Sequence, residues 1–195
     1  MCHKPLRRDS FSTLFQKEDV LCADCRGTWK RIETRFRFSG RNGFALYAYE
    51  GGFSECLLQY KELCDEALKP VFLMQDRNRL RRMYKGRTLV LLPSSEEKQA
   101  SRGFSHLAGM FECLGLPMLE PFEKTDPVSQ KKRSRTERTA MVSGIRLKSG
   151  VRIPEKIVLA DDVITTGSTM KGALAALPAD RDIRIFACGL TPKKN

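Results

Sequence analysis

The stretch IVLADDVITTGST, residues 157–169, decides how this chain folds. Its first four residues are apolar and read as a buried strand, and Asp161 and Asp162 stand at the carboxyl end of that strand. TTGST then turns through Gly167 into the helical segment MKGALAAL. A strand, a loop and a helix in this order form the basic unit of an α/β fold.

The loop of this unit has the groups that bind a phosphate monoester. It offers consecutive backbone N–H groups, the positive end of a helix and the hydroxyls of Thr165, Thr166, Ser168 and Thr169. The two preceding carboxylates would repel a phosphate, so they accept hydrogen bonds from vicinal hydroxyls or face Mg²⁺. A ribose 5-phosphate unit fits both halves. Neither G-x-x-x-x-G-K-[ST] nor G-x-G-x-x-G occurs at a strand end, which excludes two other nucleotide-binding devices.

Composition limits the class of protein. A chain of 195 residues with 41% hydrophobic content is enough for one globular core with a small appended module. No segment approaches the roughly 18 apolar residues of a membrane helix, and MCHKPLRRDS at the N-terminus lacks the apolar core of a signal peptide. We therefore expect a cytoplasmic protein. Its net charge of +12 favours polyanionic partners such as nucleic acid, phosphorylated metabolites or anionic lipid.

The cysteines near the N-terminus suggest a metal site. Seven cysteines scattered over the chain argue against a disulfide framework. Cys22 and Cys25 form a C-x-x-C pair with the spacing of a structural Zn²⁺ site, and Cys2 is a natural third ligand. His3 is adjacent to Cys2 and would strain a shared tetrahedron. The alternative is a set of reduced thiols in a frayed end. We expect a zinc-finger-like module over residues 1–38 and the main domain over residues 39–195.

Periodicity predicts the other elements. FALYAYEGG reads as a strand, TLVLLP as a strand buried on both faces, and ML at 118–119 as a short strand. A helix begins near Phe104 and is stopped by Gly115 and Pro117. An amphipathic helix is expected from Ser54 to the neighbourhood of Pro70, with these side chains on or near its apolar stripe: Cys56, Leu57, Leu58, Leu63, Cys64 and Leu68.

Two segments are strongly basic. Residues 77–87, RNRLRRMYKGR, carry six basic side chains, which either contact a nucleic-acid backbone or form a solvated helix face whose stems cover apolar surface. Residues 123–144 are the least core-like part of the chain, and we expect them to be mobile. They either close over a ligand as an arginine- and lysine-rich loop or serve as a solvated connector.

At this point the sequence resembles a known family. Residues 157–169 are similar, position by position, to the phosphoribosyl pyrophosphate (PRPP) motif of type I phosphoribosyltransferases, and the whole chain looks like the ComF (ComFC-type) late-competence branch. The other matches follow the family's order: the cysteine pair, RGF at 102–104 and SQKKRSRTER at 129–138. The resemblance implies a doubly wound parallel sheet with a flexible hood, Mg²⁺ with PRPP as ligand, and a role with single-stranded DNA in natural transformation. Competence helicase or recombination proteins would then be partners.

The resemblance also implies roles for individual residues. Asp161 and Asp162 would meet the ribose hydroxyls, with Arg138 of the flexible loop as a further catalytic residue. Ser94 and Ser95 would hold the pyrophosphate, and Arg102 lies just beyond them. The 5-phosphate would be surrounded by Thr165, Thr166, Gly167, Ser168 and Thr169.

Two departures from the family pattern bear on the activity. Met141 replaces a common asparagine, and a second C-x-x-C pair is missing. The residues also reveal no general base for a nitrogen nucleophile. The sequence leaves open whether the chain is an active transferase of nucleotide or amine metabolism without a DNA role, or a PRPP-binding protein that acts on DNA.

Overall fold

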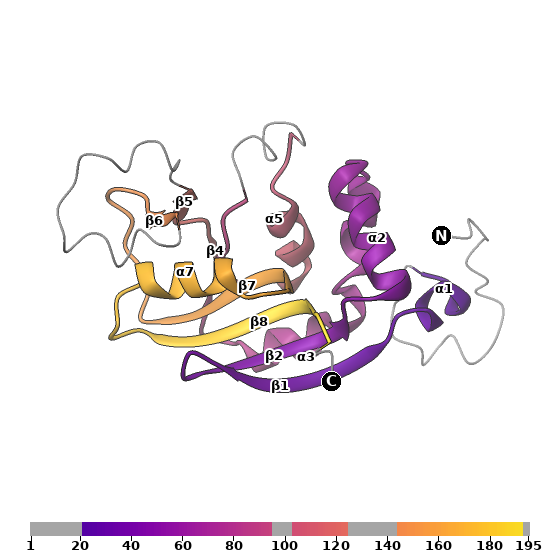
Figure 1. The fold of residues 1–195 in the computed structure, drawn as a ribbon, viewed down its shortest axis with the longest axis horizontal. Helices are drawn as coiled ribbons and strands as arrows, with labels where there is room; N and C mark the ends of the chain where they lie inside the picture. Colours follow the sequence, from indigo (N-terminus) through magenta and orange to yellow (C-terminus); the bar gives the residue numbers. More distant parts are fainter. Residues whose placement is uncertain (1–20, 95–102, 125–143, 193–195) are drawn as a thin grey trace.

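The protein is built on a mostly parallel sheet of six strands (Figure 1). The computed structural model describes residues 21–94, 103–124 and 144–192. The strand order is β1-β2-β8-β7-β3-β4, and only β1 and β2 run antiparallel. The strands are β1 (Arg31–Phe38), β2 (Arg41–Ala48), β3 (Thr88–Leu91), β4 (Met118–Leu119), β7 (Lys156–Ile164) and β8 (Asp182–Leu190).

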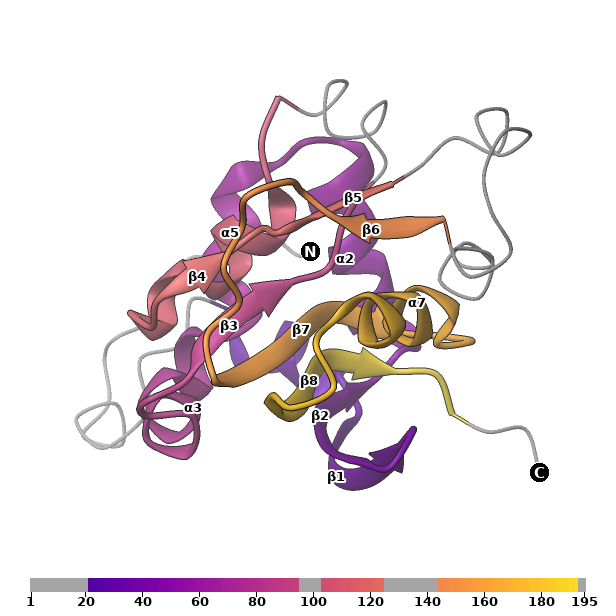
Figure 2. The ribbon, with the colours of Figure 1, turned by 90° about the vertical axis from the view of Figure 1, so that its left-hand side faces the viewer.

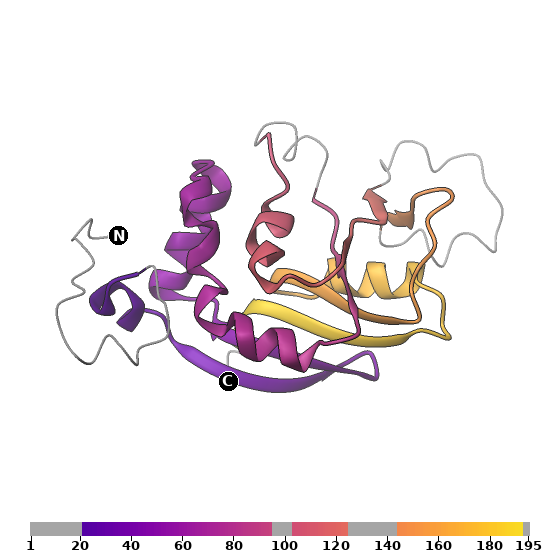
Figure 3. The same ribbon diagram turned by 180° about the vertical axis from the view of Figure 1, so that it is seen from behind.

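Helices cover both faces of this sheet. Helix α7 (Ser168–Ala176) lies in front of the sheet in Figure 1, and α3 (Arg77–Met83) lies in front of it in the opposite view of Figure 3. The other helical segments are α1 (Ala23–Gly27), α2 (Gly51–Glu62), η2 (Glu66–Val71), η3 (Met74–Asp76), α5 (His106–Phe111) and η4 (Glu112–Leu114). The expected α/β class with a mostly parallel sheet is therefore confirmed, and the arrangement is consistent with a doubly wound fold.

A second, two-stranded sheet joins the ends of the basic segment 123–144. It pairs β5 (Phe122–Lys124) with β6 (Ile145–Leu147) in antiparallel register, with Lys124 opposite Ile145. This small sheet lies on the β3 side of the main sheet (Figure 2). The base of the segment is thus held against α7 through β6, whereas most of the segment lies outside the described residues.

The core combines the central strands with an aromatic cluster. Ile157, Val158, Leu159 and Ala160 of β7 are fully buried, as the apolar run predicts. At the other end of the sheet, the Trp29 ring packs edge-on against Tyr47 and Phe53, each with ring centroids 5.1 Å apart. Trp29 is therefore a packing residue that ties the segment after α1 to β2 and α2.

Most predicted elements are confirmed, but the helix near Ser54 is shorter than expected. Strands β2, β3 and β4 and helix α5 occur where the sequence predicted them, and Gly115 ends η4 in the left-handed conformation. Helix α2 ends at Glu62, so Leu63 is exposed and Pro70 falls in η2. The buried stripe of α2 is Phe53, Cys56, Leu57 and Tyr60, a regular helical spacing.

Three of the side chains expected on the apolar stripe, Leu58, Leu63 and Cys64, are not buried. Cys56 is buried as expected, but Cys64 is exposed and has a positive φ of 54°. Leu58 is half exposed. The expectation was wrong at these positions because it relied on leucines and cysteines that lie on different sides of the segment and missed Phe53 and Tyr60, which belong to the buried face.

The N-terminal segment is joined to the main sheet. Cys22 caps α1 and its Sγ accepts a hydrogen bond from the Cys25 N–H at 3.5 Å. Strand β1 pairs with β2 along its length, so residues 31–38 belong to the main sheet together with the strands that follow residue 39. Within the ranges that the structure describes, no group of three or more metal-ligating side chains is present, and Cys2 lies outside them. The zinc-finger-like module and the division at residue 38 stay predictions.

None of the helices in the described part of the chain is both long and apolar enough to cross a membrane.

Candidate phosphosugar site

Strand β7 extends beyond the end of its neighbour β3. Leu91, the last residue of β3, is paired with Ala160, whereas β7 continues along β8 to the pair Ile164 and Leu190. Asp161 and Asp162 therefore lie within β7 but past the end of β3. The sequence placed them at the carboxyl end of the strand, and the structure adds that they are part of the strand itself.

A cavity of about 390 Å³ lies at this edge of the sheet. This volume falls within the range of small-molecule sites. Among the residues that line it are five of those predicted for PRPP, namely Ser94, Asp161, Asp162, Thr165 and Thr169. Residues separated by up to 75 positions in the chain are thus brought to one site. Carboxylates, hydroxyls and a helix N-terminus face the same space.

The other residues of the TTGST turn shape it rather than line the cavity. Gly167 has a φ of 76°, and a Cβ there would come within 2.5 Å of the Phe38 ring. The Thr166 hydroxyl donates to Ser168 Oγ at 3.2 Å, and the Ser168 N–H donates to Thr166 Oγ1 at 3.4 Å. These contacts fix the turn that begins α7. Three predicted residues, Ser95, Arg102 and Arg138, lie outside the described residues.

The carboxylate of Asp162 is held by the side chains of Lys61 and His106. Its Oδ2 accepts from Lys61 Nζ and from His106 Nε2, each at 2.6 Å. Burial on its own raises the pKa of Asp162, but the hydrogen bond from His106 and the charge of Lys61 outweigh it, so the pKa lies below its usual range. Asp162 is therefore an ionised carboxylate with a fixed orientation.

Asp161 differs from its neighbour. Burial raises the pKa of Asp161 well above its usual range, and the negative charge of Asp162 raises it further. Its Oδ1 accepts the backbone N–H of Asp162 at 2.9 Å. The side chain is half-buried and lines the cavity. A cation or a hydroxyl donor in the cavity would stabilise the ionised form of this carboxylate.

Sequence reasoning missed Lys61 and His106. Lys61 stands 101 residues from Asp162 in the chain, on α2, and nothing in its sequence context distinguishes it from other surface lysines. His106 offered a weak signal, since it is one of two histidines and follows the RGF stretch. Both side chains reach the carboxylate only because α2 and α5 pack beside β7.

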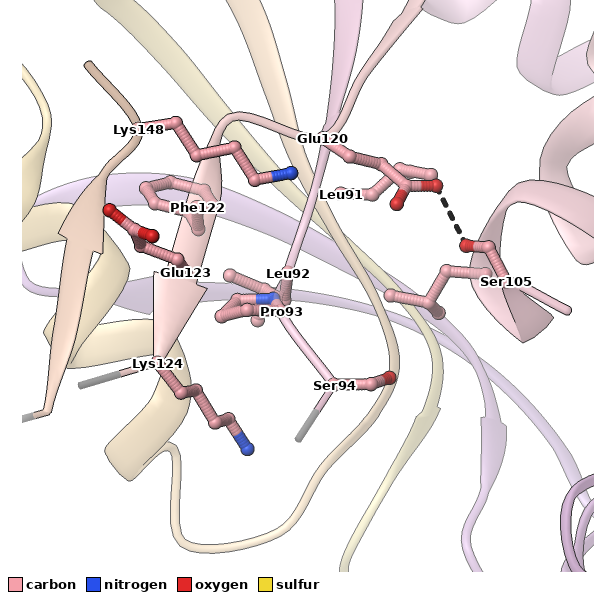
Figure 4. A pocket seen from close by; sticks show the side chains of 11 residues that line it. Leu91, Leu92, Pro93, Ser94, Ser105, Glu120, Phe122, Glu123, Lys124 and Lys148 are labelled. Carbon is pink, nitrogen blue, oxygen red and sulfur yellow. Dashed lines mark hydrogen bonds between the residues drawn. The ribbon is translucent and has the colours of Figure 1, made fainter. Parts of the chain in front are cut away.

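A smaller cavity of about 80 Å³ adjoins the first (Figure 4). The two share Leu92, Pro93, Ser94, Leu107 and Lys124 as lining residues. Lys124 and Lys148 come from the β5/β6 side, whereas Ser105 donates a hydrogen bond to Glu120 at 2.7 Å on the other. The space beyond Ser94 is thus lined by charges of both signs.

The basic segment 77–87 is partly engaged in the fold. Arg87 is 9% exposed and donates to the carboxylate of Asp182 and to the Ile157 carbonyl. Arg79 pairs with Glu33 at 2.8 Å and lies over the Phe44 ring. Only Arg81 and Arg82, among the arginines of α3, have exposed side chains. The segment therefore supports the fold at several positions and leaves a narrower basic surface than the sequence suggested.

Fold and site together describe an α/β protein with a candidate phosphosugar site at the carboxyl edge of its parallel sheet. The chain is 28% identical to the competence protein ComFC of Streptococcus pneumoniae in an alignment 204 residues long. The alignment covers 91% of this chain and 92% of that protein. It is also 28% identical over 166 residues to the competence protein ComFC of Bacillus subtilis, covering 83% and 68% of the two chains. No family model matches the chain. The resemblance to ComF-type competence proteins is confirmed by these two relatives, whose names do not mention phosphoribosyl transfer.

Proposed function

We propose that this chain acts in competence and binds Mg²⁺-PRPP in the cavity at the end of β7. One observation carries the ligand assignment: Asp161 and Asp162 line the same cavity as Thr165, Thr169 and Ser94. The competence role is supported by the two ComFC relatives, which align with most of this chain.

The chemistry of the cavity suits the three parts of PRPP. The turn before α7 supplies hydroxyls and N–H groups for the 5-phosphate. The carboxylates accept from the ribose hydroxyls or bind Mg²⁺. Ser94, with Lys124 as a further lining residue, suits the pyrophosphate. Mg²⁺ would supply charge neutralisation for the pyrophosphate group.

Calorimetric titration of Mg²⁺-PRPP tests this assignment. The wild type should bind, and the double variant Asp161→Asn/Asp162→Asn should lose the binding heat. Asp180→Asn is a matched control, because this exposed carboxylate pairs with Arg181 near the start of β8, at the other end of the strands. An unchanged titration in the double variant would reject the site.

The alternative function is an active phosphoribosyltransferase of nucleotide or amine metabolism without a DNA role. Both functions use the same pocket, so only turnover separates them. Release of pyrophosphate in the presence of a nucleobase, glutamine or ammonia would favour the transferase. PRPP binding without release in any of these mixtures would favour a binding protein.

Single-stranded DNA is the proposed macromolecular partner, and the exposed arginines of α3 support this. Each lost phosphate contact lowers the slope of log affinity against log salt by about 0.7 for single strands. Replacing Arg81 and Arg82 with glutamine should therefore weaken binding and flatten its salt dependence. Arg79→Gln should act mainly on stability, because Arg79 is paired with Glu33. Affinity that is unaffected by the Arg81/Arg82 change would remove α3 from the DNA surface.

A structural zinc ion is the remaining proposal. Cys22 and Cys25 lie within hydrogen-bonding reach of each other at the start of α1, and Cys2 would be a third ligand. We expect about one equivalent of zinc per chain, reduced by Cys25→Ser. A fully folded preparation that contains no metal would contradict this site.

A further inference from the structure

His106 lies between the two halves of the proposed site. Its Nε2 is 2.6 Å from Asp162 Oδ2, and its Nδ1 is 3.3 Å from Ser94 Oγ. Ser94 follows β3 and Asp162 belongs to β7, so the imidazole connects the ends of two neighbouring parallel strands. The His106 side chain is buried, as is that of Asp162. In such a setting hydrogen bonds are strong and a lost partner is costly.

The donors and acceptors of this bridge follow from the charge of Asp162. An ionised carboxylate only accepts hydrogen bonds, so Nε2 of His106 carries the hydrogen. In the neutral ring Nδ1 is then an acceptor, and it takes the hydroxyl hydrogen of Ser94. Both ring nitrogens are thereby used within the protein. His106 has no lone pair directed at a substrate proton, which argues against a role as general base.

The backbone of His106 is fixed as well. The hydroxyl of the fully buried Tyr60 donates to the His106 carbonyl at 2.9 Å. Ser105, the preceding residue, caps α5 by accepting the Ala108 N–H at 3.4 Å. Lys61, which follows Tyr60 on α2, reaches Asp162. The backbone that carries the ring is therefore tied to α2 through Tyr60.

We propose that His106 is a positioning residue that holds Ser94 at a fixed distance from Asp162 and so couples the pyrophosphate and ribose halves of the site. This inference rests on the proposed binding of PRPP. It assigns His106 no contact with the ligand. Small displacements between groups that bind one ligand lower affinity strongly, and residues that orient ligand-binding groups typically account for about 10- to 100-fold in binding.

Three substitutions separate positioning from simple space filling. His106→Leu fills much of the volume but removes both hydrogen bonds. His106→Gln places an amide near the position of Nε2 and keeps the contact to Asp162, whereas His106→Asn places one near Nδ1 and keeps the contact to Ser94. Circular dichroism and thermal unfolding select the variants that fold, and if His106→Leu does not fold, the Gln and Asn variants carry the test.

Calorimetry with Mg²⁺-PRPP, ribose 5-phosphate and Mg²⁺-pyrophosphate then measures the coupling. We expect His106→Leu to weaken Mg²⁺-PRPP by about 10-fold or more. His106→Gln should keep ribose 5-phosphate binding close to that of the wild type and lose affinity for Mg²⁺-pyrophosphate. His106→Asn should show the reverse. In a double-mutant cycle with Ser94→Ala, the loss for the pair should match the larger single loss and not the product.

The outcomes distinguish this inference from the proposed function. If the wild type binds Mg²⁺-PRPP and all three His106 variants bind equally well, the positioning role is wrong and the site stands. If the Ser94 and His106 losses multiply independently, the bridge does not couple the two halves. If the wild type does not bind Mg²⁺-PRPP, the proposed function is wrong and this inference fails with it.

Discussion

Replacing Lys61 with methionine tests how much the buried carboxylate of Asp162 depends on its cation. Methionine keeps the length of the aliphatic chain and removes the charge. The Lys61 side chain is 23% exposed and that of Asp162 is 8% exposed, with 2.6 Å between Nζ and Oδ2. Breaking a fully buried ion pair costs about 3–5 kcal/mol, and a hydrogen bond to a charged group is worth about 1.5–3 kcal/mol.

We expect Lys61→Met to lose about 2 kcal/mol of unfolding free energy, near the lower of these figures. The lower figure applies because Lys61 keeps some contact with water and His106 still donates to the carboxylate. For a chain of this size the loss corresponds to a drop in Tm of about 4–8 °C. Urea denaturation followed by circular dichroism and thermal scanning measure both quantities.

The control for this substitution is Lys69→Met. Lys69 also forms an ion pair, with Glu112 at 2.9 Å, but both side chains are largely exposed. Its removal should leave Tm unchanged within error, since exposed pairs contribute little. Adding Asp162→Asn to Lys61→Met should recover part of the lost stability, because the unpaired charge is then removed. If Lys61→Met is as stable as the wild type, or if Lys69→Met is equally destabilised, the reasoning about Asp162 is refuted.

Two further predictions concern the turn and the pH dependence. Gly167→Ala should lose more stability than Gly150→Ala in urea denaturation. Both glycines have a φ of 76°, which costs a residue with a side chain about 1–3 kcal/mol. Only at Gly167 would the added Cβ also collide with the Phe38 ring. Equal losses would show that the ring moves away freely. The hydrogen bond from Arg87 lowers the pKa of Asp182 in the folded protein. The carboxylate therefore stabilises the fold at any pH above its unfolded pKa of about 4. This stabilisation is lost as the pH falls from there through the lower pKa of the folded state. The stability difference between Asp182→Asn and the wild type should therefore shrink between about pH 6 and pH 2, and a constant difference would contradict the assignment.

The sequence predicts the part of the site that is continuous in the chain. A buried apolar run, two carboxylates and a glycine-containing turn define β7 and the start of α7 because each depends on nearby residues. Ser94 was expected from the family resemblance, which places the pyrophosphate at the loop after this run. These residues do meet at one cavity.

The rest of the site depends on packing between distant elements. His106 is 56 residues from Asp162 and Lys61 is 101 residues away, so their contacts follow from how α5 and α2 pack on the sheet. Local periodicity carries no information about such contacts. Periodicity also overestimated the length of α2, because the helix ends at Glu62: Leu63 and Cys64 are exposed, and Leu68 is buried from η2.

Strand β1 shows a further limit. Its residues 35–38 alternate arginine and phenylalanine, a typical pattern for an edge strand with one exposed face. The run was placed in the cysteine-containing segment of residues 1–38, before the loop that begins at Ser39. Its partner β2 and the parallel pairing of β2 with β8 determine its place, and both are properties of the assembled sheet.

The extension of β7 past β3 has a thermodynamic consequence for any ligand of the two aspartates. Carboxylates carried by a loop lose backbone freedom when they bind, and this ordering entropy opposes association. Here the backbone of Asp161 through Ile164 is already hydrogen-bonded to β8 before a ligand arrives. The backbone of that segment is therefore ordered on folding, and ligand binding does not have to order it again. The affinity of the carboxylates for a ligand is not reduced by this entropy cost.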